Sequence, residues 1–420
     1  MVGTRFGMAS GQPAKPLPGA TWQAHVLDAE AITRELNRLW AEAAGDQRDE
    51  GDGHANGEHE IRPGGVLARA STLNLVAVAR SESDAERVES AVTHLSELYP
   101  SRATILVADP ARSEGSDAGL DVRVALLEQE GKKGRPTVRF ECVTVEVSAK
   151  NERHLASIAS PLLVADLPDF LWWASSSVTS SELFEDLQAV SDRLIVDSAS
   201  FVDQGAGLRY LAALAMREQV GPKLSDFAWA RLNPWRQLVT QFFDPPSSRA
   251  ALDELDEVEI SYGTAAKGEG SGLSSALLLA GWLSSRLGWQ APGEVLPLGE
   301  EEEAWGGTLR ALSQGRRREV RLTLRRRNDA LAERCVGDVR LSSRGGKVGT
   351  FRIARTDASG LETERLDPTL APVRRIVYAS CLDDAALLAD ELRIFGRDPV
   401  YEEALGFAAN LAPDVEDGAG

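Results

Sequence analysis

Cysteine, histidine and long apolar runs are all scarce in this chain. Its three cysteines, Cys142, Cys335 and Cys381, are widely spaced, which argues against a disulfide framework or a zinc cluster. No apolar run reaches the roughly 20 residues of a membrane span, and the longest covers only residues 276–283. The N-terminal stretch also lacks the apolar core of a secretory signal. We therefore expect a cytoplasmic protein.

The motifs of common catalytic sites are missing as well. The sequence contains no G-x-S-x-G elbow, no H-E-x-x-H and no P-loop. Its five histidines stand in no recognisable pattern with Cys or Ser, which leaves little material for general-base catalysis. His54 and His59 lie in a Gly-rich acidic stretch without the spacing of a metal site. We expect no catalytic residues, no metal and no cofactor.

The charge balance narrows the range of partners. Against 46 Lys and Arg stand 64 Asp and Glu, so the formal net charge is −18. A broad nucleic-acid or anionic-membrane surface needs clustered cations, and we expect neither partner. A composition of 43% hydrophobic and 26% charged residues is that of an ordinary globular protein. A length of 420 residues then predicts two domains, with three as the alternative.

The stretch 160–198 gives the clearest indication of the fold class. Apolar runs at 170–174 and 194–196 flank a helical pattern that starts after Ser180 or Ser181, which predicts the strand–helix–strand crossover of an α/β sheet. Trp172 and Trp173 are neighbours in the first strand. Because successive strand residues face opposite sides, we expect one indole in the core and the other directed away from it.

The N-terminal domain is predicted to be a mixed β-sheet flanked by helices over residues 21–203. It follows a disordered tail at 1–20 and includes a flexible loop at 45–65, because both segments are rich in Gly and polar residues. Residues 73–108 predict a β-α-β unit, and 120–147 a hairpin. The second hairpin strand changes the phase of its alternation near Cys142, which indicates either a bulge or burial on both faces.

The C-terminal domain, residues 204–420, is predicted to combine helices with a largely antiparallel sheet. Asp226 caps a helix at 227–243 that Pro234 should kink or divide. Ser271 or Ser274 opens an apolar helix ended by Gly288. The remaining patterns predict strands at 257–262, 319–325, 335–341, 350–354 and 375–378 and helices at 385–395 and 399–409. The fold class as a whole is α/β together with α+β.

Two charged segments have both structural and functional interpretations. The Gly-rich segment Lys267–Gly272 stands where backbone amides could hold a phosphate, but its spacing fits neither nucleotide motif, and a plain loop is favoured. The Arg-rich segment 315–327 predicts a strand with Val320, Leu322 and Leu324 inward. Arg321 and Arg325 then point outward, either as an ordinary solvated face or as a patch for an acidic partner surface or an anionic metabolite.

Tryptophan and cysteine side chains supply the remaining candidates. Most of the side chains of Trp172, Trp173, Trp229 and Trp235 are expected to lie in the core. The alternative is that at least one indole is exposed beside Arg236 and serves as an anchor in a protein interface. Buried structural thiols are the expected state of the cysteines. A redox-responsive Cys335 or Cys381 is the alternative, and the sequence does not show whether the two approach within bridging distance.

Stretches spread over about residues 25–410 resemble the OpcA family, the glucose-6-phosphate dehydrogenase assembly proteins of cyanobacteria and actinobacteria. No stretch is a catalytic signature, but their number and order make the resemblance specific. They are AITRELNRLW (31–40), RASTLNLVAVA (69–79), YPSRATIL (99–106), SPLLVADLPDFLWW (160–173), DRLIVDSASF (192–201), FAWARLNPWRQLVTQFFDPP (227–246), LLLAGWLSSRLGW (277–289) and GRDPVYEEAL (396–405).

The resemblance implies a non-catalytic partner of glucose-6-phosphate dehydrogenase that favours the active oligomer and promotes the oxidative pentose phosphate pathway. In cyanobacterial members of the family, thiol redox state is associated with activity. Cys335 and Cys381 form no close pair in the sequence, so the resemblance does not extend redox control to them. The family supplies no catalytic residues to transfer. The alternative hypothesis is a sugar-phosphate-binding or sugar-phosphate-converting α/β protein that uses Lys267–Gly272.

Overall fold

The structure is a computed structural model that describes most of the chain in separate segments. These are residues 15–26, 29–49, 71–95, 99, 101–109, 120–129, 138–178, 181–217, 221–264, 270–291, 293–299, 304–313, 316–327, 334–344, 348–357, 359–366 and 372–414. Within them, no helix has the length and apolar character that crossing a membrane requires.

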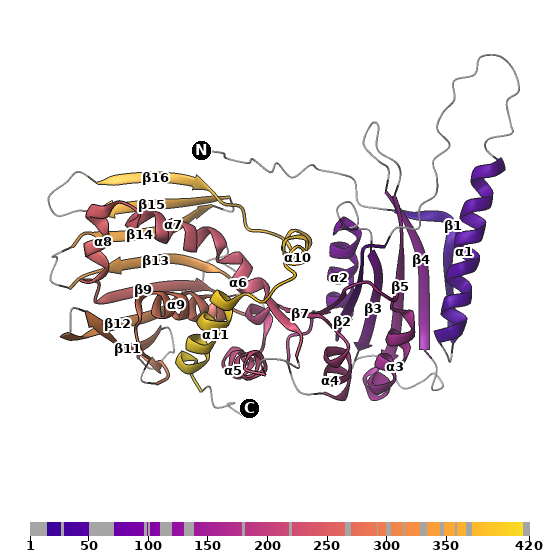
Figure 1. Ribbon diagram of the computed structural model, residues 1–420, viewed down its shortest axis with the longest axis horizontal. Helices are drawn as coiled ribbons and strands as arrows, with labels where there is room; N and C mark the ends of the chain where they lie inside the picture. The colour runs from indigo at the N-terminus through magenta and orange to yellow at the C-terminus, as the bar shows by residue number, and fades with distance from the viewer. Residues whose placement is uncertain are drawn as a thin grey trace, which may run out of the picture. The chain divides into compact units, whose positions relative to one another are not determined.

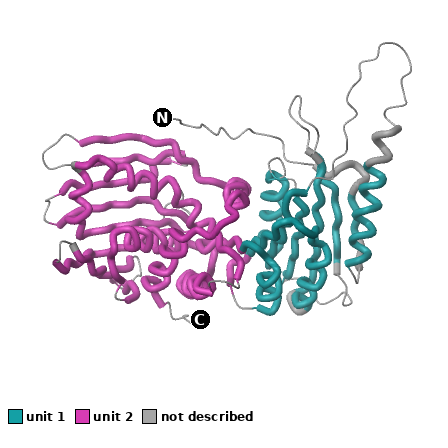
Figure 2. Tube along the Cα trace, in the orientation of Figure 1, with its two compact units in different colours: residues 1–174, 181–193 teal, residues 175–180, 194–420 magenta. Residues whose placement is uncertain are grey.

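The chain divides into two compact units, coloured separately in Figure 2. The first comprises residues 1–174 and 181–193, and the second residues 175–180 and 194–420. Residues 194–203, which the sequence pattern assigned to the first domain, thus belong to the second unit. The short segment 175–180 also belongs to it, so the chain passes between the units more than once.

A mixed sheet forms the centre of the first unit (Figure 1). The strands of this unit lie in the order β1-β4-β5-β3-β2-β6. Parallel pairing joins β5, β3, β2 and β6, and antiparallel pairing joins β1 to β4 and β4 to β5. The bounds are β1 Lys15–Val26, β2 Leu73–Ala79, β3 Ser101–Asp109, β4 Leu120–Gln129, β5 Val138–Ser148 and β6 Asp169–Trp173.

Helices cover this sheet. They are α1 Ala29–Asp49, α2 Glu82–Leu95, α3 Leu155–Ala159 and α4 Glu182–Ala189. The long helix α1 contacts β1 and β4, and α2 contacts β2 and β3. Helix α4 begins where the sequence predicted, because the Ser181 hydroxyl accepts a hydrogen bond from the Phe184 backbone N–H at 3.2 Å. The predicted crossover thus has a capped helix.

Burial on both faces of the sheet explains two features of the sequence. Strand β5 pairs with β4 without a bulge, and Phe140, Cys142 and Val143 are all buried, so the change of phase reflects two-sided burial. The expectation that only one of Trp172 and Trp173 enters the core was wrong. Both side chains are 0% exposed, because β6 is covered on both of its faces.

The predicted N-terminal tail and loop also need correction where the structure describes them. Residues 15–20, assigned to a disordered tail, belong to β1, because this strand completes the sheet by pairing with β4. Helix α1 continues to Asp49, into the segment predicted to be a loop from residue 45. The rest of that loop, including His54 and His59, lies outside the described residues.

The second unit contains a mostly antiparallel sheet in the order β10-β11-β12-β9-β13-β14-β15-β16. Only the β12–β9 pair is parallel among the pairs the structure describes. The bounds are β9 Glu257–Gly263, β10 Leu296–Pro297, β11 Ala304–Ser313, β12 Arg316–Arg327, β13 Val336–Ser342, β14 Thr350–Asp357, β15 Gly360–Leu366 and β16 Val373–Tyr378. The predicted C-terminal architecture of helices plus a largely antiparallel sheet is confirmed.

The other elements of this unit are mainly helical. They are the short strands β7 Arg193–Val196 and β8 Lys223–Asp226 and the helices α5 Gln204–Ala215, α6 Phe227–Arg231, α7 Asn233–Phe243, α8 Pro246–Leu252, α9 Leu273–Leu287, α10 Asp384–Glu391 and α11 Pro399–Leu411. Pro234 divides α6 from α7, as predicted. Helix α9 ends at Gly288, whose φ of 64° places it in the left-handed region.

One face of the second sheet carries the helices. Helix α9 contacts β9 and β12, and α7 contacts β14. Helix α11 packs on α9 so closely that a Cβ at Gly281 would lie 2.3 Å from the Ala404 carbonyl oxygen. Gly207 lies inside α5, where it makes room for the Phe201 ring.

Candidate functional site

The face of the second sheet opposite the helices carries a dense array of charged side chains. Along β12, Val320, Leu322 and Leu324 are buried, whereas Arg321 and Arg325 are exposed, which confirms the predicted alternation. We call this charged side the open face. It is a candidate binding surface because nothing in the described residues covers these exposed guanidinium groups.

Strand pairing turns scattered sequence positions into one row across the open face. Glu259 of β9 stands opposite Arg340 of β13, and Arg340 stands opposite Arg352 of β14. Arg352 in turn stands opposite Glu364 of β15, which stands opposite Arg374 of β16. Residues directly opposite each other in paired strands share a face, so these five side chains project from the same side of the sheet.

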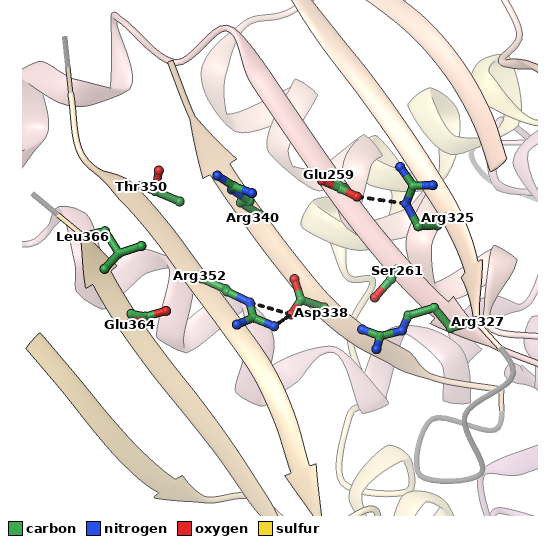
Figure 3. A pocket seen from close by; sticks show the side chains of 10 residues that line it. All are labelled: Glu259, Ser261, Arg325, Arg327, Asp338, Arg340, Thr350, Arg352, Glu364 and Leu366. Carbon is green, nitrogen blue, oxygen red and sulfur yellow. Dashed lines mark hydrogen bonds and ion pairs between the residues drawn. The ribbon is translucent and has the colours of Figure 1, made fainter. Parts of the chain in front are cut away.

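Ion pairs within the open face use only some of its arginines (Figure 3). Arg352 binds Asp338 at 2.6 Å and Arg325 binds Glu259 at 3.0 Å, as the dashed lines show. By contrast, Arg327 and Arg340 make no ion pair or side-chain hydrogen bond within the described residues. The first two guanidiniums are already neutralised, and the last two remain available to an incoming anion.

A shallow hollow of about 350 Å³ lies on this face. Charged and hydroxyl side chains line most of it, and Leu366 adds an apolar edge. The carboxylates Glu259, Asp338 and Glu364 lie among the arginines, so the hollow offers alternating charge instead of a purely cationic pocket. Such a surface can bind by complementary ion pairs, and it shows no nucleophile paired with a base.

A second hollow of about 250 Å³ contains the two C-terminal cysteines. The Sγ atoms of Cys335 and Cys381 lie 3.6 Å apart, Cys335 is buried and Cys381 is exposed. A hydrogen bond joins the two thiols, and Arg355 and Arg231 lie close by. The hydrogen bond with Cys335 and the two guanidiniums lower the pKa of the Cys381 thiol, while the pKa of Cys335 is raised. The two thiols therefore lie close enough for a short movement to join them.

Arg231 is held in this second hollow by a buried ion pair. Its Nη1 and Nη2 atoms bind the two carboxylate oxygens of Asp197 at 2.7 and 2.9 Å, and Asp384 lies 3.7 Å away. Burial would lower the pKa of Arg231, but the Asp197 carboxylate outweighs it, so the pKa is raised. The guanidinium is a fixed positive charge beside the two thiols.

The tryptophans proposed for partner binding lie in the core. The exposed fractions of Trp172, Trp173, Trp229 and Trp235 range from 0% to 5%. The Arg236 guanidinium carbon stands 3.3 Å from the centre of the Trp229 ring, and burial lowers the pKa of Arg236 to about 10. A partner cannot reach these indoles in this conformation, so they do not form a binding surface.

Other candidates yield no site. Among the described residues, no group of three or more His, Cys, Asp or Glu side chains is placed to hold a metal ion. Residues 267–269 of the Gly-rich segment lie outside the described residues. Gly270, which follows them, has a φ of 86° and approaches the Ala199 carbonyl, where a Cβ would lie 2.3 Å away. That positive φ gives Gly270 a structural role in the connection.

The sequence revealed part of the open face and missed the rest. It identified Arg321 and Arg325, but not Arg340, Arg352 or Arg374. Alternation within β13 and β14 could have indicated that these arginines face outward. Which arginines become neighbours depends on the order of the strands, and that order is not encoded in any single stretch.

Comparison with known proteins adds two family matches and several relatives. Residues 92–213 match the family model for the N-terminal domain of a glucose-6-phosphate dehydrogenase subunit, and residues 222–405 match the family model for its C-terminal domain. A "Putative OxPP cycle protein OpcA" of Nostoc punctiforme is 29% identical over 304 residues, which covers 71% of this chain and 63% of the relative.

A protein of the same description from Synechococcus elongatus is 28% identical over 64% of this chain and 59% of its own length. The chain thus matches less than two thirds of either relative. Among solved structures, a myo-inositol dehydrogenase from Lactobacillus casei aligns over 81% of this chain and 93% of its own, with a TM-score of 0.42 and 9% identity. A similarity that weak carries no argument here. The two consecutive matches are the decisive finding, and the chain belongs to the OpcA family of glucose-6-phosphate dehydrogenase assembly proteins.

Proposed function

We propose that this protein is a non-catalytic assembly factor that binds glucose-6-phosphate dehydrogenase and favours its active oligomer. The observation that carries the proposal is the pair of family matches, which follow each other along the chain over residues 92–213 and 222–405. Both models are described as parts of a subunit of that dehydrogenase. The proposed role promotes the oxidative pentose phosphate pathway and places the protein in the cytoplasm with the enzyme.

Activation needs no chemistry on the part of the activator. A protein that binds one conformation or oligomer of an enzyme more tightly than another shifts the population toward the bound form. A tenfold preference corresponds to about 1.4 kcal/mol, which a few good contacts supply. In support, the hollow on the open face joins arginines with carboxylates, which suits ion pairs with another protein.

The test combines activity with oligomer size. The purified protein is mixed at several ratios with the dehydrogenase from the same organism, and NADPH formation is followed while the mixture is analysed by size-exclusion chromatography with light scattering. We expect co-elution, a larger fraction of the active oligomer and a lower KM for glucose 6-phosphate or a higher kcat. The protein alone should turn over no glucose 6-phosphate.

An unrelated acidic protein of similar mass serves as the control, because a chain with a net charge of −18 can alter an enzyme through ionic effects alone. The proposal fails if the two proteins elute separately and the kinetics stay constant at every ratio.

A further inference from the structure

We propose that the open face of the second sheet is the surface that docks on the dehydrogenase, and that it recognises a cluster of carboxylates there. This inference rests on the proposed function and specifies its contact surface. Its central residues are Arg327 and Arg340, whose side chains have no ion-pair partner within the described part of the chain, as Figure 3 shows.

Charge is the first argument. The whole chain carries a formal charge of −18, yet the hollow on the open face is lined by four arginines and three carboxylates. This slight excess of cations leaves guanidinium groups that an anionic partner surface can pair with. Arginine is also the cation best suited to a contact surface, because its planar guanidinium binds a carboxylate with two parallel hydrogen bonds.

Internal neutralisation gives the second argument. Carboxylates already satisfy Arg325 through Glu259, Arg352 through Asp338, and Arg374 through Glu364 at 2.6 Å. These pairs neutralise the charges of the residues that form them. Arg327 and Arg340 are then the guanidiniums of the hollow that remain to pair with a partner carboxylate.

The apolar edge of the open face indicates a protein partner. Leu366 at the end of β15 and Ile376 of β16 are 40% and 76% exposed, and Ile376 stands opposite Glu362 on the open side. Interfaces between proteins join apolar contacts with arginine, whereas a small anion has no use for exposed leucine and isoleucine.

The size of the open face matches a standard interface. From β12 to β16, strands about 4.8 Å apart give a width of about 24 Å, and the seven-residue strands β9, β13 and β15 give a length of about 23 Å. The flat footprint is about 550 Å², and projecting side chains enlarge it toward the roughly 800 Å² that each partner buries in a stable complex.

The experiment measures dehydrogenase binding by wild type and by charge-reversal variants of the full chain. Arg327→Glu combined with Arg340→Glu should weaken binding at least about tenfold and flatten its salt dependence, since two attractions become repulsions. Arg217→Glu, an exposed arginine just after α5 in the same unit, makes a matched control and should bind as wild type does. Arg340→Lys keeps the positive charge but loses the two parallel hydrogen bonds of a guanidinium. It should therefore lose less affinity for the dehydrogenase than the double reversal does.

Folding and ligand controls separate the outcomes. Circular dichroism and thermal melting identify a variant that does not fold, and the neutral pair Arg327→Gln and Arg340→Gln then replaces the reversal. If wild type and both double variants bind the dehydrogenase with the same affinity, the open face is not the docking surface. The proposed function then still stands. Wild type that does not bind the dehydrogenase overturns both. Stabilisation of wild type by glucose 6-phosphate, lost in the double variant while dehydrogenase binding persists, assigns the open face to a small anion instead.

Discussion

The sulfur atoms of Cys335 and Cys381 lie 3.6 Å apart although 46 positions separate them in the sequence. Cys335 immediately precedes β13, and Cys381 follows β16, so the fold of the second sheet brings the ends of distant strands together. Both are free thiols, and the guanidiniums of Arg231 and Arg355 lie nearby. A short movement of the side chains would bring the two sulfur atoms to the roughly 2 Å of a covalent bond.

Mild oxidation should therefore join Cys335 to Cys381 within one chain. Diamide accepts the two electrons and two protons that the thiols release, and the protein should lose two of its three free thiols. Peptide mapping by mass spectrometry identifies the bond, and Cys381→Ser should abolish it. Cys142 should stay reduced, because burial raises its pKa to about 12. A bond to Cys142, or between two chains, would contradict this prediction.

Asp226 should make the protein less stable as the pH rises. Burial raises the pKa of its carboxyl group to about 6, above the usual 3.8, although the N–H groups of Ser198 and Ala228 donate to it. The stabilising contribution of the protonated form is complete below about pH 4 and is lost as the pH rises through 6. The shift corresponds to about 3 kcal/mol.

Urea unfolding of wild type and Asp226→Asn between pH 4 and pH 8 checks this. The amide keeps an oxygen acceptor for the backbone N–H groups and cannot ionise. Relative to wild type, the variant should gain stability as the pH rises through 6. Stability curves that run parallel over the whole range would show that Asp226 does not titrate in this way.

Removing the charge of Asp197 should destabilise the second unit strongly. In Asp197→Asn, the Arg231 guanidinium stays buried and loses its two-pronged partner, keeping only Asp384 at 3.7 Å. A broken buried pair costs about 3–5 kcal/mol. As a control, Asp390→Asn removes an exposed pair with Arg393 and should cost less than about 1 kcal/mol. Equal losses in the two variants, measured by urea unfolding, would refute the distinction.

Gly281→Ala should push α9 and α11 apart. The added methyl group would lie 2.3 Å from the Ala404 carbonyl oxygen, a backbone atom that cannot turn away. Overpacking of this kind typically costs about 1–3 kcal/mol, which exceeds the helix propensity that alanine gains over glycine. Gly406→Ala, where the added carbon meets nothing within 4 Å, is the matched control in α11 and should be neutral or stabilising. The free energy of unfolding of both variants is measured in urea. A Gly281→Ala protein more stable than wild type would contradict the prediction.

Strong local patterns made much of the fold predictable from the sequence. Apolar runs identified β2 and β6, and Pro234 and Gly288 marked real helix boundaries. Strands β11 and β15 were missed, because Gly306 and Gly307 interrupt one pattern and the charged sequence GLETERL conceals the other. Both strands form through pairing with neighbours, which a local pattern does not record.

The candidate site was less predictable for the same reason. Alternation showed that Arg321 and Arg325 face outward, but the row from Glu259 to Arg374 exists only after five strands pair in a particular order. The proximity of the two cysteines also depends on that order. The burial of Trp172 and Trp173 together was missed because the sequence does not show that both faces of β6 are covered.

The arginines of the open face are attached to strands that ladder hydrogen bonds hold in place. The sheet therefore fixes the spacing between the backbone positions that carry the guanidinium groups. Neighbouring strands set one interval of about 4.8 Å, and alternate residues along a strand set another of about 7 Å. The backbone positions of Arg340 and Arg327 cannot shift to fit a poorly matched partner, whereas those of loop residues could. An enzyme whose acidic groups repeat at other intervals would be rejected, so a change of strand register would alter partner choice even with every arginine retained.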